Sequence, residues 1–194
     1  QRNLLEENYL SLWHSLDPKT VKDDAKNIVI GGPSCKQPYT ASLLNISAMS
    51  FGSLSSNAIE AMNLGASKAG CYHNTGEGGV SPYHLKHGGD IVWQIGTGLF
   101  GCRDIKGNFN SELFSQTASL PVIKMIEIKL SQGAKPGHGG VLPGKKNTVE
   151  IAGIRGVEPG ITVLSPPGHS AFDGPKGLIK FVQELRELSG GKPV

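Results

Sequence analysis

The feature that most constrains the fold is a repeated alternation of short apolar runs with stretches of helical periodicity. Five runs are predicted strands: residues 45–50, 71–74, 91–96, 122–130 and 160–165. Three stretches are predicted helices: residues 51–70 (after an initial turn), 148–156 and 177–191. In the last of these, apolar side chains recur on one helical face. Strands that alternate with helices favour a parallel sheet, so the predicted class is α/β.

Glycine clusters follow most of these predicted strands. The chain has 27 glycines in 194 residues, which is twice the average of about 7%. They gather at positions 52, 76–79, 88–89, 96–101 and 137–144. Short strands with glycine-rich loops at their carboxyl ends favour a (β/α) barrel of the TIM type over an open sheet. A full barrel needs eight such units and ~250 residues, so residues 46–194 are predicted to form only its N-terminal part.

Residues 1–45 are predicted to form a leader segment that packs on the barrel. The apolar side chains of residues 3–16 have the spacing of an amphipathic helix, and Asp17-Pro18 would end it. Residues 18–45 are expected to be irregular, because turn signals interrupt them. The sequence lacks an initiator methionine, which is consistent with processing or with excision from a longer chain.

Composition argues against several kinds of partner. The net charge is +3 and no basic run exceeds Lys145-Lys146, so nucleic acid is not expected. No apolar run approaches the ~20 residues of a membrane span, and no secretory signal is visible. The three cysteines form no CxxC pair, so no metal site is predicted and reduced thiols in the cytoplasm are expected. An iron–sulfur cluster could come only from residues beyond this chain.

The turn at residues 47–55, SAMSFGSLS, is the first candidate for ligand contact. Gly52 lets the backbone approach a flat ligand closely. Met49 offers a soft apolar contact, and Ser50 offers a hydroxyl. The alternative is an ordinary strand-to-helix turn, with the serine at 55 or 56 as the helix N-cap.

The first glycine loop, GEGGV at residues 76–80, holds a lone carboxylate, Glu77. Nothing in that stretch requires an acid, so one interpretation is a ligand-binding or catalytic role. The other interpretation is a solvated loop acid. The nearby His73, His84 and His87 lack the i, i+4 pairing of a helical zinc site, so they are expected to be structural or to face solvent.

Charged residues also lie in and after the predicted strand at 122–130. Glu127 and Lys129 alternate on this strand and point to one face, where mutual pairing or ligand contact would offset the cost of burial. Lys135 follows the strand end and suits a carboxylate or a phosphate, although a surface lysine is the alternative. Arg155 could bind a carboxylate through its bidentate fork, and its alternative is a surface salt bridge.

The chain carries no familiar nucleotide or hydrolase motif, but it does carry an ordered set of others. No GxGxxG opens a helix after a strand, and Walker A and GxSxG motifs are absent. Five stretches occur in this order: AMSFGSLS, NTGEGG, EIKLSQGAKPGHGG, LPGKK and LSPPGH. Together they resemble the FMN-binding synthase domain of the glutamate synthase family, including its shorter stand-alone relatives. The resemblance runs from about residue 46 to the C-terminus.

This resemblance implies a TIM-type barrel with FMN at the carboxyl face of its strands. It implies an oxidoreductase acting on CH–NH2 donors, in which reduced flavin delivers a hydride to an imine. The imine forms from 2-oxoglutarate, or a related 2-oxo acid, and ammonia or an amine donor, and the product is glutamate. The sequence does not identify the electron donor.

Two sets of site residues follow. The first set, predicted to contact FMN, comprises Met49, Ser50, Gly52, Gln94 and Lys129. The second set, predicted to bind the 2-oxo acid, comprises Glu77, Lys135 and Arg155. Glu77 and Lys135 are also predicted to be catalytic. One lysine and one arginine suit the two carboxylates of a dicarboxylate.

One loop departs from the family pattern. Glutamate synthases usually read GEGGQ in the second glycine loop, whereas this chain reads GHGGV, with His138 and Val141. The valine removes a polar contact to the keto acid, so a second interpretation stays open. In that interpretation the chain is a non-catalytic or differently specific anion-binding barrel fragment, which works only with a complementing chain or as a homo-oligomer. The glycine-rich phosphate site of FMN belongs to later strands, so this chain alone is not expected to hold FMN tightly.

Overall fold

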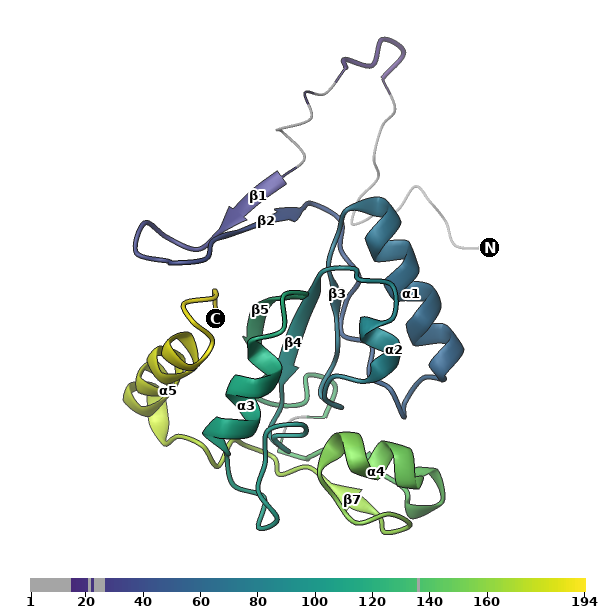
Figure 1. The fold of residues 1–194 in the computed structure, drawn as a ribbon, viewed down its shortest axis with the longest axis vertical. Helices are drawn as coiled ribbons and strands as arrows, with labels where there is room; N and C mark the ends of the chain where they lie inside the picture. The colour runs from purple at the N-terminus through teal and green to yellow at the C-terminus, as the bar shows by residue number, and fades with distance from the viewer. Residues whose placement is uncertain (1–14, 21, 23–26, 136) are drawn as a thin grey trace, which may run out of the picture.

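A parallel three-stranded sheet lies at the centre of the molecule. The computed structural model describes residues 15–20, 22, 27–135 and 137–194. The sheet has the order β3 (His73–Asn74), β4 (Ile91–Ile95) and β5 (Ile123–Ile128), which is also the chain order (Figure 1). Parallel neighbours need a crossover connection between them, and two of these connections contain helices. The α/β prediction is therefore confirmed.

Each edge of this sheet carries one further hydrogen-bonded segment. Ile46 forms a single parallel bridge with His73, so the run predicted as the first strand contributes only that bridge. At the other edge the Ile126 N–H donates to the Pro193 carbonyl oxygen at 3.0 Å. The segment after the last helix therefore lies beside β5. Within the described residues the sheet does not close into a barrel.

Four helices flank the sheet in the part of the chain that the structure describes, and side-chain caps fix the starts of three of them. Helix α1 (Ser56–Ala69) begins after Ser55, whose hydroxyl accepts from the Ala58 N–H, and ends at Gly70 in the left-handed conformation. The others are α2 (Pro82–Leu85), α3 (Ser111–Ala118) and α5 (Gly174–Leu188). Figure 1 shows α1 and α2 beside β3, and α3 and α5 on the side of β4 and β5. Helices α2 and α3 are not among the predicted helices, because they are too short to show a clear periodicity.

The main apolar core lies between the sheet and helices α3 and α5. Trp93 and Ile95 of β4 point into it, and Phe114 of α3 and Phe181 of α5 pack against them. The rings of Trp93 and Phe114 stack with their centroids 5.2 Å apart. Because side chains alternate along a strand, Gln94 points to the opposite face. That second face is where the polar groups of the sheet gather.

Between β5 and α5 the chain makes an excursion at the carboxyl end of the sheet. It comprises β6 (Val141–Leu142), a 3-10 turn (Gly144–Lys146), α4 (Val149–Arg155) and β7 (Val163–Leu164). Strands β6 and β7 pair antiparallel with each other, so the prediction that residues 160–165 form a fifth barrel strand is wrong. In this run only Val163 packs on an apolar cluster, a separate one that contains Phe51 and Ile151. Buried Asn147 ties the excursion together by donating to the Glu158 carbonyl oxygen at 2.7 Å.

A β-hairpin lies at the opposite, amino end of the sheet. Strands β1 (Asn27–Ile30) and β2 (Tyr39–Ser42) pair antiparallel, and the turn signals between them form the hairpin loop. Residues 18–45 were expected to be irregular, but part of this segment forms the hairpin. The predicted helix at residues 3–16 lies almost wholly outside the described residues, and the division of the chain at residue 45 stays a prediction.

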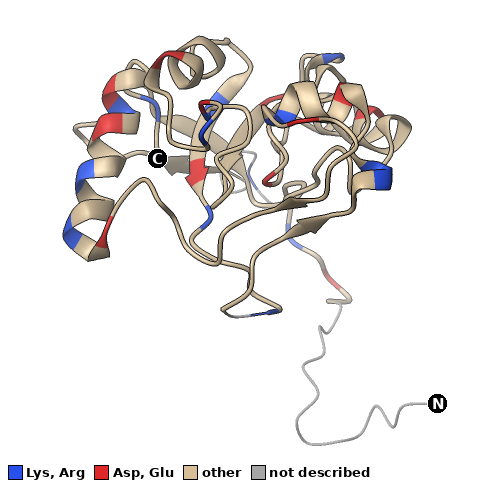
Figure 2. Cartoon of the chain, turned by 90° about the horizontal axis from the view of Figure 1, so that it is seen from below, with Lys and Arg blue, Asp and Glu red and all other residues tan. Residues whose placement is uncertain are grey.

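Charged residues of both signs are distributed over the molecule. Lys and Arg positions are interleaved with Asp and Glu positions along the helices (Figure 2). No helix in the described part of the chain has the length and hydrophobicity to cross a membrane. Those residues also contain no group of three or more His, Cys, Asp or Glu side chains placed to bind a metal ion. All three cysteines are free thiols, and burial raises the pKa of Cys102 to about 12, which leaves that thiol unreactive.

Candidate functional site

The turn after Ile46 lies against the carboxyl end of the sheet. The Met49 N–H donates to the Asn74 carbonyl oxygen at 3.1 Å. Gly52 has a φ of 95°, a conformation that favours glycine. Ser50 and Ser53 hydrogen-bond each other at 3.0 Å. The turn also leads into the Ser55 cap of α1, so its ordinary structural role and the predicted ligand role are compatible.

The first glycine loop packs directly on this turn. Gly76 has a φ of 64°, and a Cβ added to it would lie 2.9 Å from the backbone nitrogen of Ser50. A Cβ added to Gly78 would lie 3.1 Å from both Arg155 Nη2 and the Phe51 carbonyl oxygen. The loop needs glycine because two other parts of the chain press against its backbone. Glu77 is then the one long side chain that leaves this part of the loop.

Glu77 points toward the second glycine loop. Lys129 Nζ donates to its Oε2 atom at 3.1 Å, and Gln132 Nε2 donates to the same atom at 2.7 Å. Lys129 also donates to Gln132 Oε1 at 3.0 Å. A Cβ added to Gly140 would lie 2.8 Å from Glu77 Oε1. The two glycine loops therefore meet at one fixed carboxylate, which is not the solvated loop acid of the alternative interpretation.

A second polar cluster spans the three strands on the same face of the sheet. The side-chain amides of Asn74 and Gln94 both donate to Glu127 Oε1, the first at 3.1 Å. The predicted pairing of Glu127 with Lys129 is not what forms, because Lys129 reaches Glu77 instead. Within the described part of the chain, Gln94 Oε1 is buried and has no hydrogen-bond partner. A buried, unpartnered carbonyl oxygen is costly, so this atom can accept a hydrogen bond from a ligand.

Arg155, the last residue of α4, points back from the excursion toward Glu77. Its side chain is buried, its Nη2 donates to the Phe51 carbonyl oxygen at 3.2 Å, and its guanidinium carbon lies 4.9 Å from the centroid of the Phe100 ring. Burial lowers the pKa of Arg155, and the nearby charge of Glu77 opposes that lowering. Arg155 Nε has no partner among the described residues. Arg155 is therefore a buried cation with unused donors, not the residue of a surface salt bridge.

Glu77 and Arg155 line the same small cavity. Its volume is about 40 Å³, and Ser53, Gly140 and Ser165 are among its other lining residues. A volume of this size holds about one water molecule, which occupies ~30 Å³ in the liquid. Binding of a 2-oxo acid between these two side chains would therefore require the excursion to shift.

Lys135 lies in a neighbouring pocket rather than in that cavity. This pocket has a volume of about 390 Å³, and Lys135 is exposed at its rim. The two spaces share three lining residues, Gly140, Val141 and Ser165. Of the three residues predicted to bind the 2-oxo acid, two thus line one cavity and the third lines the adjoining one.

Two polar residues of this region, Asn74 and Gln132, are not among those predicted from the sequence. Both are uncharged amides, which stand out less in a sequence than isolated charges do. Their positions carry the signal that could have found them. Asn74 is the last residue of β3, and Gln132 directly precedes Gly133 in the loop after β5. Both sit at strand ends, where ligand-binding side chains of α/β proteins concentrate.

His73 and His84 form a buried pair between β3 and α2, so their predicted structural role is confirmed. Their ring centroids are 5.1 Å apart. Burial lowers the pKa of each ring to about 4, and the presence of His84 lowers that of His73 further. Both rings are therefore neutral at neutral pH. His87 is partly exposed and lies 3.3 Å from Glu60.

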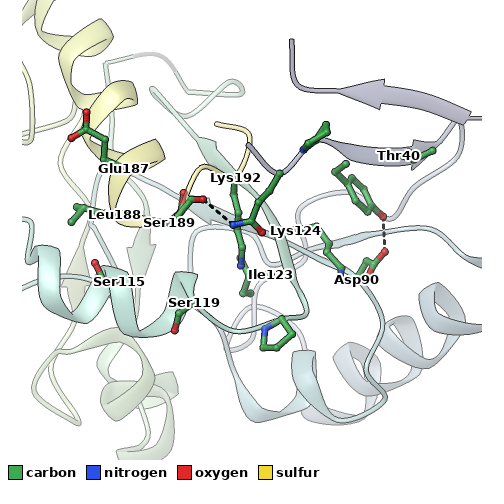
Figure 3. Close-up of a pocket in the computed structure, with 15 residues that line it drawn as sticks. Thr40, Asp90, Ser115, Ser119, Ile123, Lys124, Glu187, Leu188, Ser189 and Lys192 are labelled. Carbon is green, nitrogen blue, oxygen red and sulfur yellow. Dashed lines mark hydrogen bonds and ion pairs between the residues drawn. The ribbon is translucent and has the colours of Figure 1, made fainter. Parts of the chain in front are cut away.

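A larger cavity, of about 840 Å³, lies at the opposite end of the sheet (Figure 3). The hairpin, the starts of β4 and β5, and the ends of α3 and α5 line it. Three of its charged groups have partners: the Tyr39 hydroxyl donates to Asp90 at 2.9 Å, and Lys124 lies 3.5 Å from the same carboxylate. Lys192 donates to two carbonyl oxygens after helix α3 and at its end. None of the predicted site residues lines this cavity, so the candidate site is the one at the carboxyl end.

Comparison with known proteins points to one family. A family model described as a conserved region in glutamate synthase matches residues 8–194. The glutamate synthase large subunit-like protein YerD of Bacillus subtilis (strain 168) is 46% identical over 168 residues, which cover 86% of this chain and 32% of YerD. The archaeal glutamate synthase (NADPH) of Archaeoglobus fulgidus is 38% identical over 150 residues, which cover 76% of this chain and 27% of that protein.

A third relative, the glutamate synthase (NADPH) large chain of Bacillus subtilis (strain 168), is 36% identical over 148 residues, which cover 73% of this chain and 9% of that protein. The chain thus spans about a third or less of the length of these curated relatives. The family model, in contrast, matches nearly the whole of the chain. The chain belongs to the glutamate synthase family.

Proposed function

We propose that this chain supplies part of the active site of an FMN-dependent oxidoreductase of glutamate synthase type. The reaction is the reductive amination of a 2-oxo acid, with 2-oxoglutarate as the reference acceptor and glutamate as its product. The carrying observation is that Glu77 and Arg155, from distant motifs, line one cavity at the carboxyl ends of parallel strands. Because the chain spans about a third or less of its relatives, the activity is proposed for the whole protein.

We also propose that the sheet is part of a TIM-type barrel and that FMN binds at its carboxyl end. The unpartnered Oε1 of Gln94 fits this group, because a flavin ring offers an N–H donor. The turn with Met49, Ser50 and Gly52 lies at the same end of the sheet, where its backbone could contact the flavin, and Lys129 lies nearby. When bound, reduced FMN supplies a hydride. Any iron–sulfur cluster would be bound by residues outside this chain.

The chain's own residues would bind the acceptor and move protons. The Arg155 guanidinium would bind one carboxylate, since its buried Nε has no partner within the described residues. Lys135 would hold a second carboxylate or donate a proton to the keto oxygen. Glu77, held by two donors, would accept a hydrogen bond from the incoming ammonia or amine. Loss of water from keto acid and amine gives an imine, and one hydride plus one proton give the amino acid.

A differently specific anion-binding site is the second candidate, and Val141 favours it. This side chain lines both cavities and is 58% exposed. It offers no hydrogen bond to a distal carboxylate, so another 2-oxo acid could be the better acceptor. Such a site could require a complementing chain or a second copy of this one. We place either activity in the cytoplasm, because free thiols persist in a reducing compartment.

The role of Arg155 can be tested by substrate binding to the full-length protein. Arg155→Gln should weaken 2-oxoglutarate binding, measured by calorimetry, by about tenfold or more, because a buried charge-assisted contact is lost. Arg103→Gln is the matched control, since Arg103 also lies over the Phe100 ring but donates to the Gly98 carbonyl oxygen. This control should bind within about twofold of wild type. Equal binding by Arg155→Gln, or no binding by wild type to any 2-oxo acid, would overturn the assignment.

A further inference from the structure

The turn that carries Met49 is fixed by two buried groups from different parts of the chain. The Met49 N–H donates to the Asn74 carbonyl oxygen at 3.1 Å. Its own carbonyl oxygen lies 3.0 Å from Nε2 of His84, a fully buried side chain of α2. The first contact comes from the backbone of the sheet, whereas the second depends on one side chain.

The hydrogen bonds around His84 define its tautomer. The Ser81 backbone N–H can only donate, and it lies 3.2 Å from Nδ1, so Nδ1 carries no proton. The Met49 carbonyl oxygen can only accept, so the proton is on Nε2. The Ser81 hydroxyl, 2.7 Å from Nδ1, can donate to the same nitrogen. Burial lowers the pKa of His84 to about 4, which maintains this neutral form at neutral pH.

The second partner of His84 is Ser81, which connects the contact at Met49 to the first glycine loop. Ser81 directly follows the first glycine loop and is the N-cap of α2, in a reciprocal capping box with His84. One imidazole ring therefore binds the Met49 turn through Nε2 and the end of the Glu77 loop through Nδ1. These two loops carry the residues predicted to contact flavin and acceptor, and they also pack on each other at Gly76 and Ser50.

We propose that His84 is a positioning residue, which holds the Met49 turn in register with the Glu77 loop and thereby sets the affinity of the protein for FMN. This inference rests on the proposed function, which assigns the turn to the flavin. The charged groups of α2 and the segment after it are directed elsewhere, because Lys86 and His87 lie 2.7 Å and 3.3 Å from Glu60 of α1. From β3, only the ring of His73 faces His84 among the described titratable groups.

His73 provides a matched control for His84. Both rings are fully buried and lie side by side. Neither ring nitrogen of His73 has a hydrogen-bond partner among the described residues. Replacing His73 thus removes a similar volume from the same cluster without breaking a contact to either loop.

The first experiment measures FMN affinity of the full-length protein by quenching of flavin fluorescence. His84→Leu, which loses both contacts, should raise the Kd for FMN by about tenfold or more. His84→Gln retains a donor at the Nε2 position and should restore the Kd to within about threefold of wild type. His84→Asn retains only the Ser81 side and should resemble His84→Leu. His73→Leu should stay within about twofold. Wild-type affinity in both His84→Leu and His84→Asn would overturn the proposal.

A second experiment gives a readout that does not need flavin. In hydrogen exchange of the FMN-free protein, peptides over residues 47–55 and 76–84 should exchange about tenfold faster in His84→Asn than in wild type. Peptides over α3 should be unchanged. If the two loops exchanged at the same rate in His84→Asn as in wild type, or if α3 also lost protection in the variant, a positioning role would be contradicted. If wild type binds no FMN, the proposed function fails, but this comparison still decides whether His84 holds the two loops.

Discussion

Glycines surround Glu77 at positions where a side chain would collide with it. A Cβ added to Gly96 would lie 2.8 Å from the Cβ of Glu77, and one added to Gly140 would lie equally close to its Oε1. A Cβ added to Gly139 would overlap the Ser165 carbonyl oxygen. The carboxylate thus lies in a slot whose walls are glycine backbone. Close packing of this kind restricts its position more than two hydrogen bonds alone could.

A single methyl group tests this slot. Gly140→Ala should displace the Glu77 carboxylate and lower kcat/KM for the 2-oxo acid by about tenfold or more, because a misplacement of about 1 Å is costly in catalysis. Gly133→Ala is the control from the same connection, since a Cβ there has no neighbour within 4 Å. It should keep kcat/KM within about twofold. Steady-state kinetics of the whole protein would decide, and equal values for the two variants would contradict the slot.

The residues of the site could be predicted better than their partners. Glu77 stands out in the sequence because it is a lone acid in a glycine loop, whereas Arg155 is an arginine at the end of a predicted helix. The sequence also places Glu127 and Lys129 on one face, which the structure confirms, yet Lys129 bonds Glu77 across 52 residues of chain. That contact depends on how two loops fold over the sheet. Alternation along one strand contains no such information.

At the scale of elements, α2 shows why short helices escape sequence analysis. It has four residues, too few for a periodic pattern, and a capping box fixes its start, while His84 lies beside His73. Its sequence signal is the Ser81-Pro82 start, since serine is a preferred N-cap and proline a preferred first helical residue. The buried histidine pair gives this part of the fold a pH dependence.

That pair predicts acid sensitivity. The pKa of His73 is about 4 in the folded chain against an ordinary 6.5, so the unfolded chain binds the proton first as pH falls. Stability should therefore be complete above pH 6.5 and decline toward pH 4, with a slope of at most about 1.4 kcal/mol per pH unit for each histidine. His73→Phe should make this decline shallower, because only His84 then contributes.

Urea unfolding at a series of pH values would measure this slope. His87→Gln is the control, since His87 is partly exposed and bonded to Glu60. Its slope should match that of wild type. If His73→Phe and wild type lost stability equally between pH 6.5 and 4, the buried pair would not be the source of the acid sensitivity.

At the scale of the molecule, the parallel sheet could be predicted from the sequence, but the pairing of residues 160–165 could not. Alternating strands and helices predicted the parallel sheet, and Pro193 lies beside β5, where a sheet continuing in chain order would place the next segment. Of the apolar side chains in residues 160–165, Val163 packs on the core cluster of the excursion, whereas Ile161 and Leu164 are exposed. The strand in this run pairs with β6 and not with that sheet. A short apolar run therefore shows neither how deeply its side chains are buried nor against which partner they pack.

Three features of the whole molecule meet at one site: a parallel sheet, a turn and a glycine loop held together at its carboxyl end, and a buried Arg155 beside Glu77. We propose that together they serve the reduction of a 2-oxo acid by flavin. The most direct test is anaerobic reoxidation of the reduced full-length protein, followed by the absorbance of oxidised flavin. We predict that a 2-oxo acid and ammonium together reoxidise the flavin and yield one amino acid for each flavin. If the protein binds no flavin, or if reduced flavin persists with every 2-oxo acid and amine tried, the claim is contradicted.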